Sequence, residues 1–310
     1  MAVSYWERFS SRLKTPDEAR EPFGRVLQRE LRAEEPAQLL IYTPSDETIK
    51  TKSPASVLAL TARGWLLAAE AKDGDAMVTR SDFAHTLRVE LTDILLYGAL
   101  RIAFATDVGV ESVTIEFNTV MQRYYDEAVQ LVLDGMDGIE ASPTVDHAEW
   151  EPLLEPLPLK FHNGFLRFTP RGERLLALVE WPAVFGTRRR WFQHELAPEA
   201  ALALTDRELL LISEEKTWSW LRIGRPNKYG YIVTHCPLSR LEGYHVSESG
   251  PLATLDLTLR AGGAVGDTVE IALPLERKAA LRDVVLHAFA VKAKASVATC
   301  KKSYGQSAPY

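Results

Sequence analysis

Hydrophobic residues along this chain alternate with polar residues and then switch to helical spacing, and this happens twice. Alternation predicts a strand with one buried face, and a repeat every three or four residues predicts a helix with one buried side. The residues concerned are Val113, Ile115, Phe117, Met121, Tyr125, Ala128 and Leu131 or Val132 in the first half, and Val269, Ile271, Leu273, Leu281, Val284 or Val285 and Ala288 in the second. Each half is therefore expected to be a set of strands followed by one helix.

An internal repeat supports the same division. Residues 57–67 align without a gap with residues 201–211, and Glu70 then stands opposite Glu214, an offset of 144. Further along, residues 90–95 correspond to residues 237–242, so the offset has grown. A repeat of this kind indicates duplicated structural units, and the growing offset indicates loop insertions in the second copy.

The second copy shows the pattern of about seven strands. We expect strands at residues 174–180, 191–196, 209–213, 231–234, 238–246, 253–260 and 268–273, with a bridging segment at 201–204. The glycines between residues 261 and 267 predict a hairpin loop there. Leu281, Val284 and Leu286 are expected to face the strands from the covering helix.

These patterns predict five parts along the chain. They are a helical N-terminal segment (1–29), a first domain (30–137), a proline-rich linker (138–157), a second domain (158–291) and a flexible tail (292–310). Residues 1–13 have the spacing of a short amphipathic helix, and little order is expected after Lys294. Within the linker, Trp150, Leu153 and Leu154 are apolar and are expected to pack against a domain.

Two segments of the second copy resemble the bacterial pleckstrin-homology-like (PH-like) domains: residues 204–212, Leu-Thr-Asp-Arg followed by an aliphatic run, and residues 237–241, Pro-Leu-Ser-Arg-Leu. The first copy keeps Thr61 and Arg63 of this pattern but has Ala62 and Gly64 at the other two positions. The resemblance implies a mainly β (α+β) fold of two tandem PH-like barrels, each about seven antiparallel strands capped by a C-terminal helix. It also implies a binding role rather than catalysis.

The Thr-Asp-Arg sequence at the strand entry also has a purely structural explanation. Threonine and aspartate side chains bond nearby backbone N–H groups at tight turns. The arginine can pair with the aspartate or cover the barrel rim. These residues are therefore interpreted as marks of the fold and not as a functional site.

Composition and charge narrow the classes of partner. The 310 residues suit two domains, and the net charge of −6 argues against binding to nucleic acid. Two cysteines exclude a disulfide scaffold and a four-cysteine zinc site. The apolar runs are too short for a transmembrane segment, and residues 1–13 lack the pattern of a secretory signal. A cytoplasmic protein is expected.

No pattern of catalytic residues is found in the sequence. The seven histidines show no i, i+4 pair, and there is no glycine-rich phosphate loop and no nucleophile elbow. We therefore predict no catalytic residues, no metal site and no cofactor. The alternative is an enzyme of unrecognised type with a site between the two repeats.

Arginines near residue 188 form the most suggestive charged group. Arg188 and Arg190 are expected in the loop between the first two strands of copy two, and Lys50 and Lys52 take the comparable place in copy one. In a strand, residues two apart share a face, so these side chains could hold phosphate groups. The alternative is that they are charges that keep an exposed strand edge from pairing.

A second candidate surface lies in the insertion before residue 230. Trp218, Trp220 and Arg222 alternate, so that one face could present two indoles and a guanidinium to a partner. The alternative is that the tryptophans cover the barrel. The sequence as a whole predicts a non-catalytic binding or scaffolding protein with a protein partner, or in the alternative a binder of anionic lipid headgroups.

Overall fold

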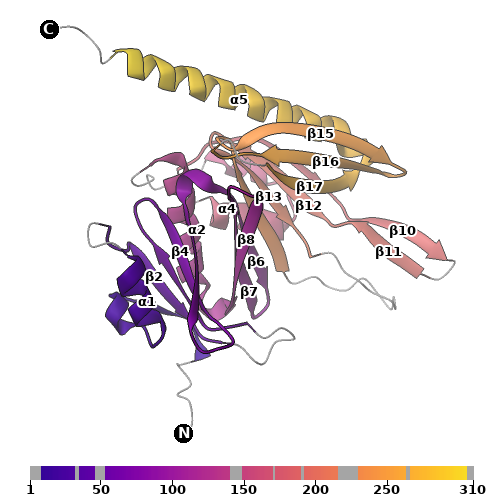
Figure 1. Ribbon diagram of the computed structural model, residues 1–310. Helices are drawn as coiled ribbons and strands as arrows, with labels where there is room; N and C mark the ends of the chain where they lie inside the picture. The colour runs from indigo at the N-terminus through magenta and orange to yellow at the C-terminus, as the bar shows by residue number, and fades with distance from the viewer. Residues whose placement is uncertain are drawn as a thin grey trace. The chain divides into compact units, whose positions relative to one another are not determined.

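The computed structural model describes residues 8–31, 35–45, 53–139, 149–169, 172–189, 192–215, 230–262 and 266–305; for residues 187–189, 192–193 and 296–305 it describes the backbone only. These residues form a mainly β structure of several antiparallel sheets with a few helices (Figure 1). They group into two compact units. Unit 1 comprises residues 1–143, 229–234 and 260–267, and unit 2 comprises residues 144–228, 235–259 and 268–310.

Unit 1 contains two sheets and two α-helices. Its elements are β1 (Ser11–Leu13), η2 (Pro16–Glu18), α1 (Phe23–Glu30), β2 (Leu39–Thr43), β3 (Ser56–Leu60), β4 (Gly64–Glu70), β5 (Ala76–Asp82), η3 (Phe83–His85), β6 (Thr86–Ile94), β7 (Tyr97–Ala105), β8 (Val110–Asn118), η4 (Thr119–Met121) and α2 (Gln122–Asp137). The first sheet has the strand order β1-β2-β3-β4-β5, and the second runs β8-β7-β6. The start of β14 (Gly230–Pro237) joins the second sheet beside β6.

Helix α2 closes the core of unit 1. Tyr125, Ala128 and Val132 are buried as their spacing predicts, and the helix packs on β3, β4 and β6. It ends at Gly138, whose φ of 68° is the left-handed conformation that glycine adopts most easily at a helix C-terminus. On the sheet β1-β2-β3-β4-β5, α1 buries Phe23 and Leu27.

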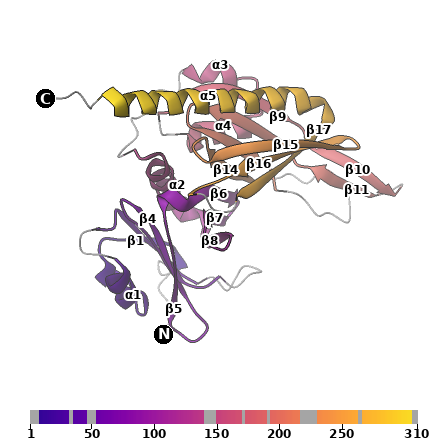
Figure 2. The same cartoon turned by 45° about the horizontal axis from the view of Figure 1, so that its top comes forward.

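Unit 2 is built from the following helices and strands. They are α3 (Glu151–Leu154), α4 (Leu159–Phe168), β9 (Leu175–Trp181), β10 (Val184–Arg189), β11 (Phe192–Ala197), β12 (Ala200–Thr205), β13 (Glu208–Ser213), the end of β14, β15 (Leu241–Ser249), β16 (Leu252–Leu259), β17 (Asp267–Pro274), η6 (Leu275–Arg277) and α5 (Lys278–Gly305). One sheet runs β14-β13-β12-β9 and another β15-β16-β17. Helix α5 packs on β9 and β12 (Figure 2). Phe289 of this helix contacts Tyr244 of β15.

The strand pairing of the two units agrees residue by residue. Strands β3 and β4 pair from Ser56↔Ala69 to Leu60↔Trp65, and β12 and β13 pair from Ala200↔Ser213 to Leu204↔Leu209, so every partner is 144 residues later. Strands β6 and β7 skip one residue between Thr86 and Arg88, and β15 and β16 skip one between Leu241 and Gly243, an offset of 155. A bulge at the same place in two hairpins is a specific structural feature, because it shifts all later pairs.

The turn between the first two matched strands is also the same in both units. Thr61 Oγ1 accepts from the backbone N–H groups two and three residues later, at 3.3 and 3.2 Å. Thr205 Oγ1 does the same at 3.1 and 2.9 Å, as expected for threonine at this turn. Asp206 instead accepts from the backbone N–H and the guanidinium of Arg174, at 3.0 and 3.3 Å.

The strands do not close into the expected barrels. In the described residues unit 1 has two open sheets with α2 packed on them, and unit 2 has two open sheets with α5 packed on them and the two-stranded ribbon β10-β11. Strand β14 explains part of the difference, because residues 230–234 belong to unit 1 and the rest of the strand to unit 2. The boundary between the units therefore passes through a strand that the repeat had assigned wholly to the second copy.

Other segments also differ from the sequence-based expectation. Ser11–Leu13 forms strand β1 instead of helix, because it pairs with β2. Helix α5 continues to Gly305, beyond the expected end near Lys294, and its Leu286 is 44% exposed although Leu281 and Val284 are buried. Leu286 lies next to Val285, which takes the buried side of the helix.

The expected linker is partly built into unit 2. Trp150 and Leu154 are buried, and the Trp150 indole N–H donates to the carbonyl of Glu173 at 3.2 Å, whereas Leu153 is 44% exposed. Helix α4 was not predicted, and it buries Phe161 and Phe165 against β13.

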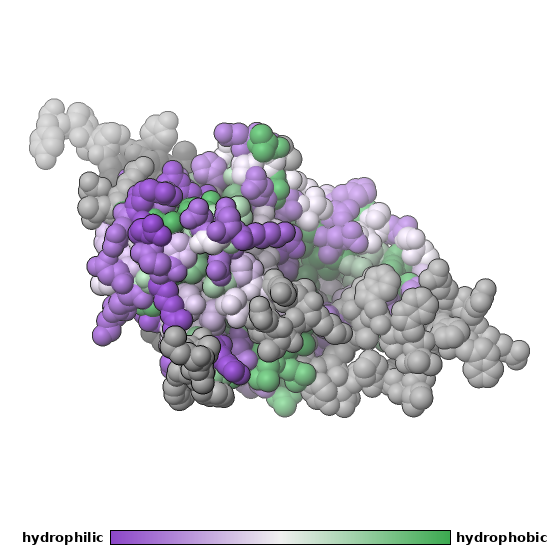
Figure 3. All heavy atoms as spheres, turned by 60° about the horizontal axis from the view of Figure 1, so that its bottom comes forward, coloured by the Kyte–Doolittle hydropathy of each residue, from purple (hydrophilic) through white to green (hydrophobic). Residues whose placement is uncertain are grey.

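No helix within the described ranges is both long enough and apolar enough to cross a membrane. On the face drawn in Figure 3, hydrophilic residues cover large areas and hydrophobic residues are exposed only in small groups. The large apolar side chains therefore lie mainly in the cores of the two units.

Candidate functional site

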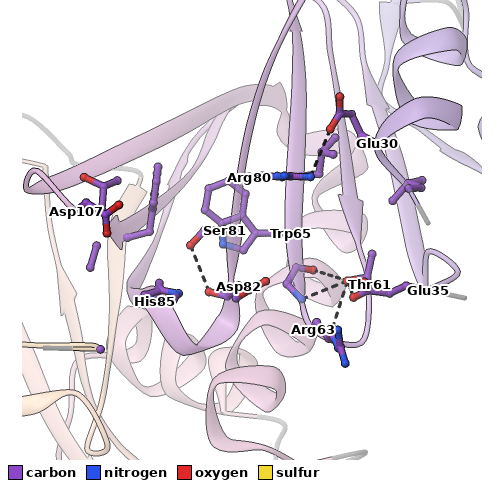
Figure 4. Close-up of a pocket in the computed structure, with 17 residues that line it drawn as sticks. Glu30, Glu35, Thr61, Arg63, Trp65, Arg80, Ser81, Asp82, His85 and Asp107 are labelled. Atoms are coloured by element: carbon purple, nitrogen blue, oxygen red, sulfur yellow. Dashed lines mark hydrogen bonds and ion pairs between the residues drawn. The ribbon is translucent and has the colours of Figure 1, made fainter. Parts of the chain in front are cut away.

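Unit 1 contains a groove of about 740 Å³. It lies where the β3–β4 turn, the end of β5, the β7–β8 turn and the end of α1 meet, and Gly262 also lines it. Figure 4 shows Asp107 toward one end and Arg63 with Glu35 toward the other, with His85 and Asp82 between them. All of these residues belong to unit 1.

The floor of the groove is a buried tryptophan held in a hydrogen-bonded chain. Trp65 is 2% exposed, and its indole N–H donates to Thr86 Oγ1 at 3.1 Å. The Thr86 hydroxyl donates in turn to the carbonyl of Asp82 at 3.2 Å. Phe104 packs edge-on against Trp65 with ring centroids 5.0 Å apart. This arrangement is rigid because each polar group of the floor has a partner.

The β3–β4 turn forms one wall. Thr61 donates its hydroxyl hydrogen to Glu35 Oε1 at 2.7 Å while it accepts from the turn N–H groups. Gly64 allows β5 to pass close by, since a Cβ atom there would lie 2.3 Å from the carbonyl oxygen of Ser81. The turn thus places the Arg63 side chain at the rim, where it is exposed.

Charged groups of both signs line the groove. Arg80 pairs with Glu30 at 3.4 Å. Within the described part of the chain, the side chains of Arg63, Asp82 and Asp107 make no ion pair or hydrogen bond and are exposed. With Glu30, Glu35, Asp82 and Asp107 against Arg63 and Arg80, the groove carries more negative than positive charge.

The groove also contains a histidine, His85. His85 is exposed and, among the described residues, makes no hydrogen bond to a carboxylate or a hydroxyl. A nucleophile activated by a base needs such a contact. Its ring instead packs beside Gly262, whose Cα would carry a Cβ 3.1 Å from the ring.

Unit 2 holds a buried pair of a histidine and a glutamate at the turn that matches the groove wall. His235 Nδ1 lies 3.0 and 3.1 Å from the carboxylate oxygens of Glu208, and both side chains are almost fully buried. Glu208 stands where unit 1 has Gly64. The two turns therefore share a backbone but present different chemistry.

Most of the sequence-predicted binding residues fall outside the described residues. These are Lys50, Lys52, Arg190, Trp218, Trp220 and Arg222. Arg188 lies on β10, which pairs with β11 as a two-stranded ribbon, so it belongs to a strand and not to the expected loop; only its backbone is described. Figure 1 shows this ribbon projecting from the rest of unit 2.

The groove residues were not recognised as a site from the sequence. Arg63 and Thr61 had been interpreted only as marks of the fold, and Asp82 and Asp107 had no distinguishing pattern. The available signal was a difference between the copies, since Gly64 in the first turn stands opposite Glu208 in the second.

Within the described ranges, no three side chains of His, Cys, Asp or Glu come together in a way that could hold a metal ion. The chain matches no protein-family model, and no curated protein matches it.

Proposed function

We propose that this chain is a non-catalytic binding protein built from two PH-like units, and that the groove of unit 1 takes a charged, extended segment of a protein partner. The observation that carries the proposal is the shared architecture. Each unit has a sheet of four matched strands, β2-β3-β4-β5 or β9-β12-β13-β14, then three more strands and one covering helix. That order resembles the PH-like fold, in which binding and not catalysis is the usual role.

The groove supports a charged protein segment as the ligand because charged groups of both signs line it. Arg63 at one end and Asp107 at the other are exposed, and their side chains have no partner among the described residues. Charges arranged in this way select a ligand by complementarity and speed its association, and both effects weaken with added salt. The buried Trp65 provides a fixed floor beneath them.

The test is a selection of random twelve-residue peptides displayed on phage, with the full chain as bait. Peptides that bind are then synthesised and measured by fluorescence anisotropy against Arg63→Glu and Asp107→Lys. Each variant should weaken binding about tenfold, which corresponds to about 1.4 kcal/mol. Arg101→Glu and Glu111→Lys are matched controls, because both residues are exposed in unit 1 and neither lines the groove. Peptides that bind all four variants equally would refute the groove as the site.

A second candidate function is binding of anionic lipid headgroups by the β10–β11 ribbon. Its support is that Arg188 lies on a strand of the ribbon and Arg190 follows directly after that strand. Replacing both with glutamate should abolish sedimentation with vesicles of phosphatidylcholine and phosphatidylserine at low salt. Wild-type protein that ignores these vesicles at low salt would remove this candidate and leave the first unaffected.

A further inference from the structure

Unit 2 leaves open a sheet edge that unit 1 covers. In unit 1, β1 pairs antiparallel with β2, which in turn pairs with β3. In unit 2, β9 pairs with β12 in the way that β2 pairs with β3, and β9 is the last strand of its sheet. No strand in the described part of the chain lies on its outer side. Its residues from Leu175 to Leu178 are half-buried, whereas Leu39–Ile41 of β2 are buried.

Two side chains hold β1 in place in unit 1. Ser10, directly before β1, has its Oγ 2.7 Å from the hydroxyl of Tyr125 on α2. Arg12, two residues later, has Nη1 3.0 Å from both carboxylate oxygens of Glu127 on the same helix. Residues two apart in a strand point to the same face, so a hydroxyl and a cation together reach α2.

The matching positions of unit 2 carry groups that lack such partners. Trp181 stands at the end of β9 as Thr43 stands at the end of β2, since each pairs with the first residue of the next strand. Trp181 is fully buried, and in the described residues its indole N–H has no acceptor. It lines a hollow of about 190 Å³ together with Leu211 and Ile271. A buried N–H group without an acceptor is rare in folded proteins.

The two residues of α2 that hold β1, Tyr125 and Glu127, also have counterparts on α5. With the offset of 156 that relates Ile115 to Ile271, Tyr125 corresponds to Leu281 and Glu127 to Asp283. Leu281 is smaller than tyrosine and brings no hydroxyl group. Asp283 is exposed and has no ion pair or hydrogen bond within the described residues. Within the described residues, therefore, unit 2 has no strand that corresponds to β1, the Trp181 indole N–H has no acceptor, and Asp283 has no ion pair.

We propose that the outer edge of β9 binds an extended segment of a partner protein as an added antiparallel strand. The segment carries serine or threonine, whose oxygen accepts from Trp181 Nε1, and lysine or arginine two residues later, which pairs with Asp283. Backbone hydrogen bonds to an open edge provide affinity, and the two side chains provide specificity. The positive charge of the segment complements Asp283, whereas Glu180 on β9 already pairs with Arg277 at 3.5 Å. This site belongs to unit 2 and does not depend on the groove of unit 1.

The β1 segment itself supplies a probe of the required chemistry. A fluorescein-labelled peptide with the sequence of residues 8–14, Arg-Phe-Ser-Ser-Arg-Leu-Lys, is titrated with the full chain and followed by anisotropy. Saturable binding is expected, and Asp283→Lys should weaken it at least tenfold. A peptide with glutamate in place of the second arginine should bind Asp283→Lys better than it binds the wild type. Glu111→Lys, which makes the same charge change in unit 1, should leave both affinities unchanged.

Trp181→Phe tests the other anchor with the ring body retained. The wild type should bind the serine peptide several-fold more tightly than one with alanine in place of the first serine, and Trp181→Phe should bind the two equally. If that variant does not fold, as judged by circular dichroism, the charge exchange at Asp283 still tests the proposal. The proposal would be overturned if no saturable binding were seen up to about 1 mM peptide, because a dissociation constant above that concentration is too weak for specific recognition.

A second copy of the chain could instead cover the same edge. Sedimentation of the wild type should therefore show a monomer. A dimer that Leu178→Lys dissociates would overturn the proposal and assign the β9 edge to self-association.

Discussion

Tyr125 offers a quantitative test of the unit 1 core through the pH dependence of stability. Its hydroxyl lies 2.7 Å from Ser10 Oγ and 2.7 Å from Thr43 Oγ1, and its ring stacks on Phe117 with centroids 3.6 Å apart. Burial raises the pKa of the Tyr125 phenol to about 12, although the hydrogen bonds from Ser10 and Thr43 favour the phenolate and oppose the shift. In the unfolded chain the pKa of a tyrosine is about 10.

The sign of the effect follows from this difference in pKa. Because the folded-state pKa is the higher one, the stabilising contribution is complete below pH 10 and is lost as the pH rises from 10 to 12. In that range the unfolded chain is stabilised, because it releases a proton that the folded protein keeps. At about 1.36 kcal/mol for each pKa unit, the two units amount to about 3 kcal/mol, of which about 2 kcal/mol is lost by pH 12.

The assay compares urea unfolding of the wild type and Tyr125→Phe between pH 8 and pH 12. At pH 8 the variant should be less stable by about 1–2 kcal/mol, because Ser10 and Thr43 lose their shared partner. That difference should shrink by about 2 kcal/mol by pH 12, since only the wild type carries the buried phenol. Because the two proteins share all other tyrosines and lysines, the titration of those residues cancels when the two free energies of unfolding are subtracted. A difference that stays constant from pH 8 to pH 12 would refute the burial of the phenol.

Two substitutions test the matched turns of the two units. Gly64→Ala should destabilise unit 1 by about 2–3 kcal/mol in urea unfolding, because its Cβ would lie 2.3 Å from the Ser81 carbonyl oxygen. Gly109→Ala, which meets no atom within 4 Å, should change stability by less than about 0.5 kcal/mol, and equal effects of the two would contradict the close strand approach. Glu208→Ala should destabilise unit 2 by about 3 kcal/mol, because it leaves His235 buried without its carboxylate. An unchanged unfolding midpoint for Glu208→Ala would show that the pair is not formed.

The sequence by itself determined several of the strands and where the covering helices α2 and α5 lie, but it missed β1 and α4 and assigned residues 201–204 of β12 to a bridging segment. Alternation and helical spacing are local properties, so Ile115 and Phe117 could be placed on a strand, and Tyr125 and Ala128 on the buried side of α2, without knowledge of their partners. The turn bonds of Thr205 were also predictable, because a threonine side chain reaches only nearby backbone groups.

Elements whose conformation depends on distant partners were not predictable in this way. Ser11–Leu13 has helical spacing but becomes a strand, because β2, about thirty residues later, offers it backbone hydrogen bonds. Trp150 lies among prolines that suggested a linker, yet a carbonyl in unit 2 accepts its indole N–H. In both cases a tertiary contact outweighs a weak local preference.

The candidate sites depend wholly on tertiary structure. Arg63, Asp82 and Asp107 stand on turns or strand ends that follow no hydrophobic period, and they meet only because the two sheets of unit 1 bring those ends together. The open edge of β9 likewise cannot be predicted from the residues of β9, since the sequence of a strand does not determine how many strands pair with it. Periodicity shows which side of an element is buried, and only the packed sheets decide which turns converge and which edges stay free.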